Sequence, residues 1–159
     1  MTTLVVGTGE VGTAIREYAP DFDVRSRSTD PPFDANDDDD AASAAAYDRI
    51  IWCCDASPAK VLRHFHGDFT LVSTIQVFRD TEYGLRKAAV ERLCLAADMR
   101  SLSIWRFGYI FGPGEEPSRL IPAIVSGVLA SVDGGIIRPV SAAYAAHVIV
   151  RDAYGPPVS

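Results

Sequence analysis

The chain has 159 residues, a length that suits one hydrophobic core, and its 48% hydrophobic and 23% charged residues are typical of a folded globular protein. Its formal net charge of -6, with no basic block, argues against a nucleic acid partner, because nucleic-acid-binding proteins concentrate lysine and arginine on one surface. No apolar run reaches the roughly 20 residues that cross a bilayer and no signal-type stretch opens the chain, so we expect no membrane partner and a cytoplasmic location.

Short β-type runs alternate with helical patterns along the first half of the chain. Thr3 to Val6 is predicted to be a strand that ends at Gly7, and apolar residues at helical spacing then follow from Val11 until Pro20. The next predicted strands are Phe22 to Ser26, Phe33 to Ala35 and Arg49 to Cys54. Two further helices are predicted, one that starts at Asp37 and continues into an alanine-rich stretch, and one over Pro58 to Phe65.

The second half continues the same alternation. It contains predicted strands at Phe69 to Val77, Ser101 to Tyr109 and Ile136 to Val140, helices at Tyr83 to Ala97, Pro117 to Leu129 and Ala142 to Arg151, and a turn at Gly134-Gly135. The pattern predicts an α/β fold, a doubly wound, mainly parallel Rossmann-type sheet with helices on both faces. No repeat, linker or change of composition divides the chain, so we expect residues 1–159 to form a single domain.

A glycine-rich turn joins the first predicted strand to the first helix. Gly7-Thr8-Gly9-Glu10-Val11-Gly12 fits the pattern G-x-G-x-x-G of dinucleotide-binding proteins. Gly7 would allow the tight turn, Gly9 would let a pyrophosphate approach the backbone, and Gly12 would let the helix pack closely on the strand. The free N-H groups of the helix N-terminus, including those near Glu10 and Val11, would then face the phosphates. Alternatively, the glycines serve only the turn.

The residues after the second strand bear on the choice of dinucleotide. Proteins that select NAD usually carry Asp or Glu there, whereas this chain has Ser26 and Arg27. A guanidinium binds phosphate with two parallel hydrogen bonds and a hydroxyl adds another. We therefore expect NADP(H) as the preferred cofactor, with NAD(H) as the alternative. An arginine exposed only to solvent is the other interpretation.

Tyr83 and Lys87 stand four residues apart in a predicted helix and therefore on one face of it. A lysine cation beside a phenol favours its ionised form, and a nearby hydroxyl such as that of Thr74 can hold a substrate carbonyl. These three residues are the parts of a proton-transfer site.

Four segments together resemble the extended or atypical short-chain dehydrogenases/reductases, of the NAD-dependent epimerase/dehydratase and sugar-nucleotide reductase type. They are Gly7 to Gly12, Ser73 to Phe78 (like S-S-x-x-V-Y), Tyr83 to Lys87 with Glu91, and Arg106 to Gly114 (like R-x-x-x-V-Y-G-P-G). The resemblance implies that Thr74 orients the carbonyl, that Tyr83 is the acid/base, and that Lys87 holds the cofactor ribose. The chain departs from the family in its short link between Thr74 and Tyr83 and in a largely missing substrate lobe.

These features favour an NAD(P)-dependent oxidoreductase that moves a hydride between NADP(H) and a carbonyl or alcohol carbon of a small or sugar-type substrate. A sugar-nucleotide epimerase or dehydratase is an alternative with related chemistry. A non-catalytic NADP(H)-binding redox sensor or regulatory module is an alternative of another class, because a fold does not by itself fix a function.

Two further expectations concern ligands and assembly. The helix from Tyr83 to Ala97 is apolar on more than one face, and relatives pair through this helix, so we expect a homodimer or a higher homo-oligomer. His64 and His66 have no carboxylate or cysteine at ligand spacing, so no metal site is predicted. The three cysteines are predicted to be buried free thiols of a reducing compartment.

Overall fold

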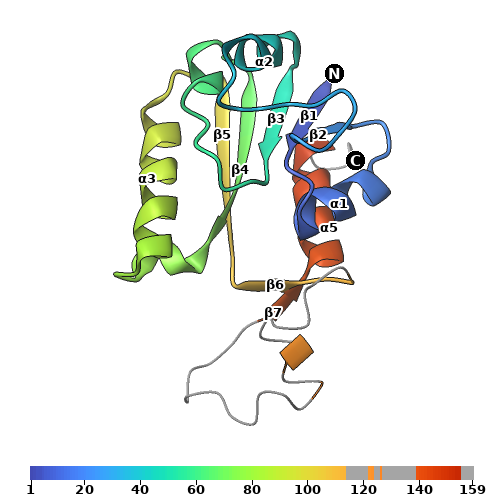
Figure 1. Cartoon of the computed structure of the whole chain (residues 1–159), viewed down its shortest axis with the longest axis vertical. Coiled ribbons are helices and arrows are strands. Elements are labelled where there is room, and N and C mark those ends of the chain that lie inside the picture. Colours follow the sequence, from blue (N-terminus) through green and yellow to red (C-terminus); the bar gives the residue numbers. More distant parts are fainter. Residues whose placement is uncertain (114–121, 124–125, 127–138, 155–159) are drawn as a thin grey trace, which may run out of the picture.

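A computed structural model describes residues 1–113, 122–123, 126 and 139–154. Its main feature is a five-stranded parallel sheet in the order β2-β1-β3-β4-β5, flanked by helices (Figure 1). The strands are β1 (Thr3–Val6), β2 (Asp23–Arg25), β3 (Arg49–Trp52), β4 (Asp68–Thr74) and β5 (Ser101–Phe107). The predicted α/β, doubly wound Rossmann-type fold is therefore confirmed.

Helices cover both faces of this sheet. They are α1 (Glu10–Tyr18), α2 (Asp38–Ser43), α3 (Glu82–Ala96) and α5 (Ala142–Tyr154). Figure 1 shows α1 and α5 together on one side and α3 on the other. Short 3-10 turns lie at Ala44–Ala46, Val61–Arg63 and Ile75–Phe78. No helix in the described part of the chain has the length and hydrophobicity required to cross a bilayer, and the cytoplasmic location stays a prediction.

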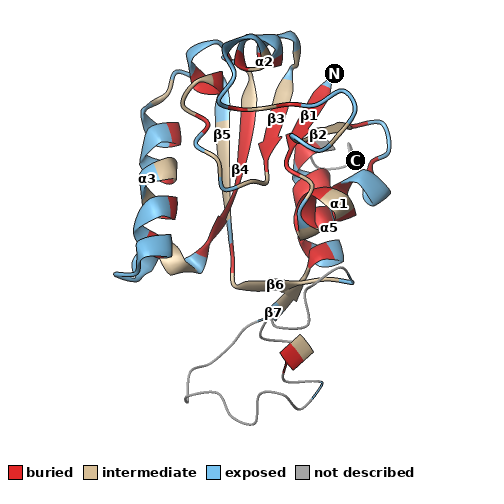
Figure 2. Cartoon of the chain, in the orientation of Figure 1, coloured by how far each residue is buried: buried red, intermediate tan, exposed pale blue. Residues whose placement is uncertain are grey.

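The alternation of side chains along each strand divides the core into two layers. On β3, Ile51 packs with α1 and α5, whereas Ile50 and Trp52 pack on the opposite face. All three side chains are fully buried, and Figure 2 shows buried residues along the inner strands. Parallel strands buried on both faces read as continuous apolar runs, which is why this strand was evident from sequence.

β5 leads out of the main sheet at Gly108. The chain then forms β6 (Tyr109–Phe111), which pairs in parallel with β7 (Pro139–Ser141) in a separate two-stranded sheet (Figure 1). The sequence predicted one strand over Ser101 to Tyr109, so its end is corrected here. Most of the predicted helix at 117–129 and the turn at 134–135 lie outside the described residues. The single domain over 1–159 stays a prediction for the same reason.

Two predicted elements do not form as expected. Phe33 to Ala35 is not a strand, because Pro31 and Pro32 before it have no N-H to donate to a ladder and the Phe33 N-H instead donates to the Ser26 carbonyl at 2.9 Å. The predicted helix at Pro58 to Phe65 is reduced to the 3-10 turn Val61–Arg63. So short a segment cannot offset the cost of starting a helix, and three apolar side chains anchor it instead: Val61, Leu62 and Phe65.

Candidate functional site

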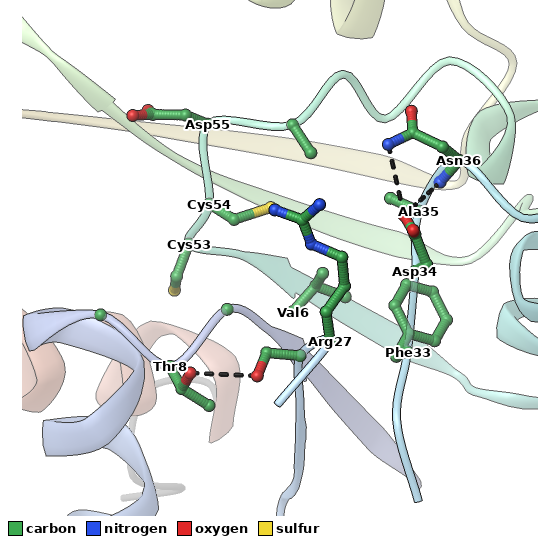
Figure 3. A pocket seen from close by; sticks show the side chains of 14 residues that line it. Val6, Thr8, Arg27, Phe33, Asp34, Ala35, Asn36, Cys53, Cys54 and Asp55 are labelled. Carbon is green, nitrogen blue, oxygen red and sulfur yellow. Dashed lines mark hydrogen bonds between the residues drawn. The ribbon is translucent and has the colours of Figure 1, made fainter. Parts of the chain in front are cut away.

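The strand order reverses between β1 and β3, and the candidate site lies there. The chain leaves β1 toward β2 on one side, whereas β3, β4 and β5 follow on the other. Loops that diverge from neighbouring parallel strands leave a crevice outside their carboxyl ends. A pocket of about 430 Å³ occupies this crevice (Figure 3). Its lining consists of Val6, Gly7, Thr8, Gly9, Ser26, Arg27, Phe33, Asp34, Ala35, Asn36, Cys53, Cys54, Asp55 and Ala56.

The glycine-rich turn forms the floor of this pocket, and its three glycines have different surroundings. Gly7 has a φ of 114°, which only glycine adopts readily, and its N-H donates to the Arg25 carbonyl at 2.8 Å. A Cβ on Gly12 would lie 1.9 Å from the Gly7 carbonyl oxygen, whereas a Cβ on Gly9 would meet no atom within 4 Å. Gly7 and Gly12 are therefore required by the fold, but the open space at Gly9 is available to a ligand.

Gly9 is also the N-cap of α1 and brings no side-chain cap to the helix. The first N-H groups of α1 have no partner within the helix and attract anions. Val11 is buried in the core, so only its backbone is available to a ligand. The Glu10 carboxylate lies away from the pocket lining, close to Gly112: a Cβ on Gly112 would be 2.0 Å from Glu10 Oε2. Glu10 thus connects the glycine-rich turn with the end of β6.

Ser26 and Arg27 form the wall that follows β2. The Ser26 hydroxyl accepts a hydrogen bond from the Thr8 hydroxyl at 3.0 Å, and this bond ties the wall to the glycine-rich turn (Figure 3). Arg27 is exposed and extends across the pocket, between the segment from Asp34 to Asn36 and the cysteines (Figure 3). Within the described residues, no carboxylate forms a salt bridge with it. Its guanidinium is a cation in a pocket with its hydrogen-bond capacity available.

The opposite wall was not identified from the sequence. Asp34 and Asn36 come from the segment that was predicted to be a strand, and the Asp34 carboxylate accepts from the backbone N-H of Asn36 at 3.0 Å. Cys54 and Asp55 follow β3. No motif marks these four positions. Only the expectation that loops at the carboxyl ends of adjacent strands meet could have indicated them.

Thr74, Tyr83 and Lys87 lie on the next elements, β4 and α3. Thr74 is the buried last residue of β4, and its hydroxyl accepts from the Gln76 N-H at 3.2 Å, which starts a 3-10 turn instead of the predicted continuation to Val77. Tyr83 is 39% exposed, and Lys87 Nζ lies 5.9 Å from the centroid of its ring. The structure thus confirms that Tyr83 and Lys87 share a helix face. None of the three residues lines the pocket itself.

Lys87 is joined to the pocket by a salt bridge. Its Nζ lies 2.6 Å from Oδ1 of Asp55, and only 11% of the lysine side chain is exposed. Asp55 is a lining residue of the pocket, so this contact connects the pocket with the candidate proton-transfer residues.

A buried polar network holds α3 against the sheet beside these residues. Glu91 is 5% exposed and accepts from the Ser73 hydroxyl at 2.6 Å and from the Arg106 guanidinium at 2.9 and 2.7 Å. Although burial alone would raise the pKa of Glu91, the hydrogen bonds from Arg106 and Ser73 lower it below its ordinary value. Glu91 is therefore held as a carboxylate one helical turn from Lys87, and Ser73 is the neighbour of Thr74.

The cysteines agree with their prediction in part. All three cysteines are free, but Cys53 and Cys54 are only half-buried, unlike Cys94. Burial raises the pKa of the Cys94 thiol to about 11 and raises the pKa of both Cys53 and Cys54. These thiols therefore stay protonated at neutral pH. Within the described residues, no three potential metal ligands form a cluster.

Comparisons with known proteins bear on the fold. No family model matches the sequence, and no curated protein is significantly similar to it. Among solved structures, the chain is similar to CapF, a capsular polysaccharide assembling protein from Staphylococcus aureus, with a TM-score of 0.73 and 18% identity over 100% of this chain and 50% of that one.

Two further solved structures are similar. A conserved protein of unknown function from Silicibacter pomeroyi gives a TM-score of 0.60 at 15% identity, over 94% of this chain and 66% of that one. A short-chain dehydrogenase from Streptomyces avermitilis gives a TM-score of 0.59 at 17% identity, over 94% of this chain and 82% of that one. The chain spans half of the CapF chain and about two thirds of the Silicibacter chain. At these identities the likeness concerns the fold, which is of the Rossmann type found in short-chain dehydrogenases.

Proposed function

We propose that this chain binds NADP(H) in the pocket at the carboxyl ends of β1 and β3. The observation that carries the proposal is the open backbone at Gly9, which lies at the N-terminus of α1 and on the floor of a 430 Å³ pocket. A pyrophosphate needs close approach to backbone N-H groups, and a helix N-terminus supplies them with a favourable dipole. The volume falls within the usual range for small-molecule sites.

We infer a preference for NADP(H) over NAD(H) from the residues of the wall after β2. Arg27 offers a guanidinium in the pocket, and Ser26 offers a hydroxyl beside it. Together they suit a 2'-phosphate better than two ribose hydroxyls. The lining also contains the carboxylates of Asp34, which accepts from the Asn36 N-H, and Asp55, which is paired with Lys87.

Fluorescence titration with NADPH and NADH tests the binding proposal. We expect NADPH to bind more tightly, and Arg27→Ala to weaken NADPH by about 10-fold or more, as expected when a charged hydrogen bond is lost, while NADH changes little. Gly9→Ala should weaken both dinucleotides without a loss of stability, because its Cβ would project into open space. Equal affinities for the two dinucleotides, or unchanged NADPH binding in both variants, would contradict the proposal.

For catalysis, we propose hydride transfer between the dinucleotide and a carbonyl or alcohol carbon of a small or sugar-type substrate. The bound nicotinamide would supply or accept the hydride. The Tyr83 phenol, which is partly exposed, gives or takes the proton of the substrate oxygen. The Thr74 hydroxyl orients that oxygen, and the Lys87 ammonium binds the ribose. The network of Glu91, Ser73 and Arg106 fixes the backbone that carries these groups.

We also propose that the chain pairs with a second copy through α3. Its buried face consists of Gly84, Lys87, Glu91 and Cys94. Apolar side chains remain exposed on other faces of the helix, namely Leu85, Leu93 and Leu95. Light scattering at micromolar concentration should give the mass of a dimer or higher oligomer, and Leu85→Arg with Leu95→Arg should give the mass of a monomer. A monomeric mass for the unchanged protein would contradict this proposal.

A further inference from the structure

Asp55 connects the two halves of the proposed site. It lines the dinucleotide pocket together with Gly9 and Arg27, and its carboxylate lies 2.6 Å from Lys87 Nζ. In Figure 3 its side chain points away from the Arg27 guanidinium. Thr74, Tyr83 and Lys87 contribute nothing to the pocket lining, and Asp55 is a lining residue that contacts this group through Lys87.

The burial of the two partners is unequal. The Lys87 side chain is 11% exposed, whereas the Asp55 side chain is 65% exposed. A lysine side chain in water can adopt many rotamers, but a buried one cannot. The position of a buried ammonium depends on the groups that it contacts inside the protein. Among the described residues, Asp55 is the carboxylate within salt-bridge distance of Lys87, and the centroid of the Tyr83 ring lies 5.9 Å from the same ammonium.

We propose that Asp55 is a positioning residue for the cofactor site. Its carboxylate fixes the Lys87 ammonium beside the pocket before the dinucleotide binds, so that the ribose hydroxyls meet a donor that is already in place. This inference rests on the proposed function. A donor immobilised before binding loses less rotamer entropy when the ligand arrives, and binding is tighter by that amount.

The charge of Asp55 gives a second reason for this role. An isolated carboxylate in a pocket for a polyanion would repel the ligand. Paired with Lys87, it makes a neutral unit, and the Arg27 guanidinium in the pocket is then opposed by less negative charge. A direct contact of Asp55 with the ribose is a different arrangement, which the first experiment below separates from positioning through Lys87.

A double-mutant cycle on NADPH affinity tests whether Asp55 acts through Lys87. Asp55→Asn should weaken NADPH binding by about 2- to 10-fold, which is the usual cost of leaving one long side chain without a fixed position. In a Lys87→Gln background the same substitution should weaken NADPH binding by less than about 2-fold. Asp34→Asn is the matched control, because it removes the same charge from the same pocket but its carboxylate contacts Asn36. The effect of Asp34→Asn on NADPH affinity should be equal with Lys87 present and in the Lys87→Gln background. Tighter binding by Asp55→Asn, or a loss of equal size with and without Lys87, would overturn the proposal.

NMR of the lysine ammonium groups tests the contact without any cofactor. Lys60 and Lys87 are the only lysines in the sequence, and Lys60 is paired with Asp38 at 2.9 Å, so it serves as an internal reference. Exchange of the Lys87 ammonium protons with water should become at least several-fold faster in Asp55→Asn, while Lys60 stays unchanged and the melting temperature shows a folded protein. Unchanged exchange at Lys87 would overturn the proposal.

The two experiments also separate this inference from the proposed function. A protein that binds neither NADPH nor NADH, but in which Lys87 exchange depends on Asp55, would overturn the proposed function and the cofactor role of Asp55 while confirming the contact. A protein that binds NADPH tightly, but shows no coupling between Asp55 and Lys87, would overturn the role of Asp55 alone.

Discussion

The charged side chains at the two ends of the parallel strands are arranged differently. At the amino ends, Asp68 accepts from Arg100 at 2.7 Å through both carboxylate oxygens and from the Ser101 hydroxyl at 2.7 Å, and Arg49 lies 3.5 Å away. These contacts, above all the hydrogen bonds from Arg100, lower the pKa of Asp68 to about 2. Arg49 also donates to the carbonyl of Ala153 and so ties the last helix to the sheet.

At the carboxyl ends, several groups have no such partner. Arg27 forms no salt bridge with a described residue, Gly9 faces open space, and the Tyr83 phenol is partly exposed. Polar groups that are fully paired stabilise the fold, whereas polar groups that converge on a pocket without partners are available to a ligand. The difference identifies one end of the sheet as structural and the other as the proposed site.

The largest expected effect is at Tyr83. Tyr83→Phe should lower turnover by about 10²- to 10⁴-fold with NADPH affinity nearly unchanged, because it removes the proton donor and keeps the ring. A panel of ketones, aldehydes and keto-sugars with NADPH would supply the substrate for this assay. Tyr18→Phe removes an exposed phenol from α1, outside the proposed site, and should leave turnover unchanged. Parental turnover in Tyr83→Phe would refute the proposed mechanism, and NADPH binding without any turnover would favour a sensor.

The glycine-rich turn allows a test within one motif. Gly12→Ala should destabilise the fold by about 3 kcal/mol, because the new Cβ would lie 1.9 Å from the backbone oxygen of Gly7, which cannot move freely. Gly9→Ala should change stability by less than about 0.5 kcal/mol. Urea denaturation measures both. Similar losses of stability in the two variants would show that the space at Gly9 is needed by the fold and not by a ligand.

Glu91 tests whether pairing, and not position at one end of the sheet, marks structural residues. It lies near the carboxyl ends of β4 and β5 but is fully paired with Ser73 and Arg106. Glu91→Gln should cost about 2 kcal/mol of stability, because it breaks the ion pair between the buried Glu91 carboxylate and the partly exposed Arg106 guanidinium. Glu82→Gln on the same helix removes an exposed pair 3.9 Å long and should cost less than about 0.5 kcal/mol. Equal effects in thermal denaturation would contradict this distinction.

The smallest expected effect is at the amino ends and depends on pH. Because folding lowers the pKa of Asp68 to about 2 from an ordinary value of 3.8, its contribution is present above about pH 4 and is lost as the pH falls through about 2. With solvent screening taken into account, Asp68→Asn should cost about 1 kcal/mol at pH 7. Denaturation at pH 7 and at pH 2 to 3 should show this cost decreasing in acid, and a constant cost would exclude the ionised carboxylate as its origin.

The parts of the molecule that were predictable depend on local sequence. The turn from Gly7 to Gly12 and the face shared by Tyr83 and Lys87 are properties of a few consecutive residues, so their patterns could be recognised directly. The contact between Asp55 and Lys87, and the wall formed by Asp34 and Asn36, arise from which loops the sheet order brings together. Spacing along one chain contains no signal for such contacts.

Element ends were missed for related reasons. The apolar alternation continues from β4 through Ile75 and Val77, but the Thr74 hydroxyl caps a 3-10 turn and ends the strand. A side-chain cap competes with the ladder at a single residue, and periodicity over a window does not detect it. The segment at Phe33 to Ala35 does not join the sheet because of the prolines before it, and its residues line the pocket.

Gly84 has a consequence for how the site can vary among related sequences. A Cβ there would lie 2.3 Å from the Gln76 carbonyl oxygen and 2.6 Å from that of Arg79, and the Gly84 N-H donates to the Thr81 hydroxyl at 3.1 Å. The start of α3 is thus fixed directly on the turn that follows Thr74. One residue inserted between Gly84 and Lys87 would rotate the ammonium by about 100° around the helix axis, away from both Asp55 and Tyr83. Insertions that preserve the site must therefore fall outside this short segment. The number of helical residues between Tyr83 and Lys87 sets the distance between the phenol and the ammonium.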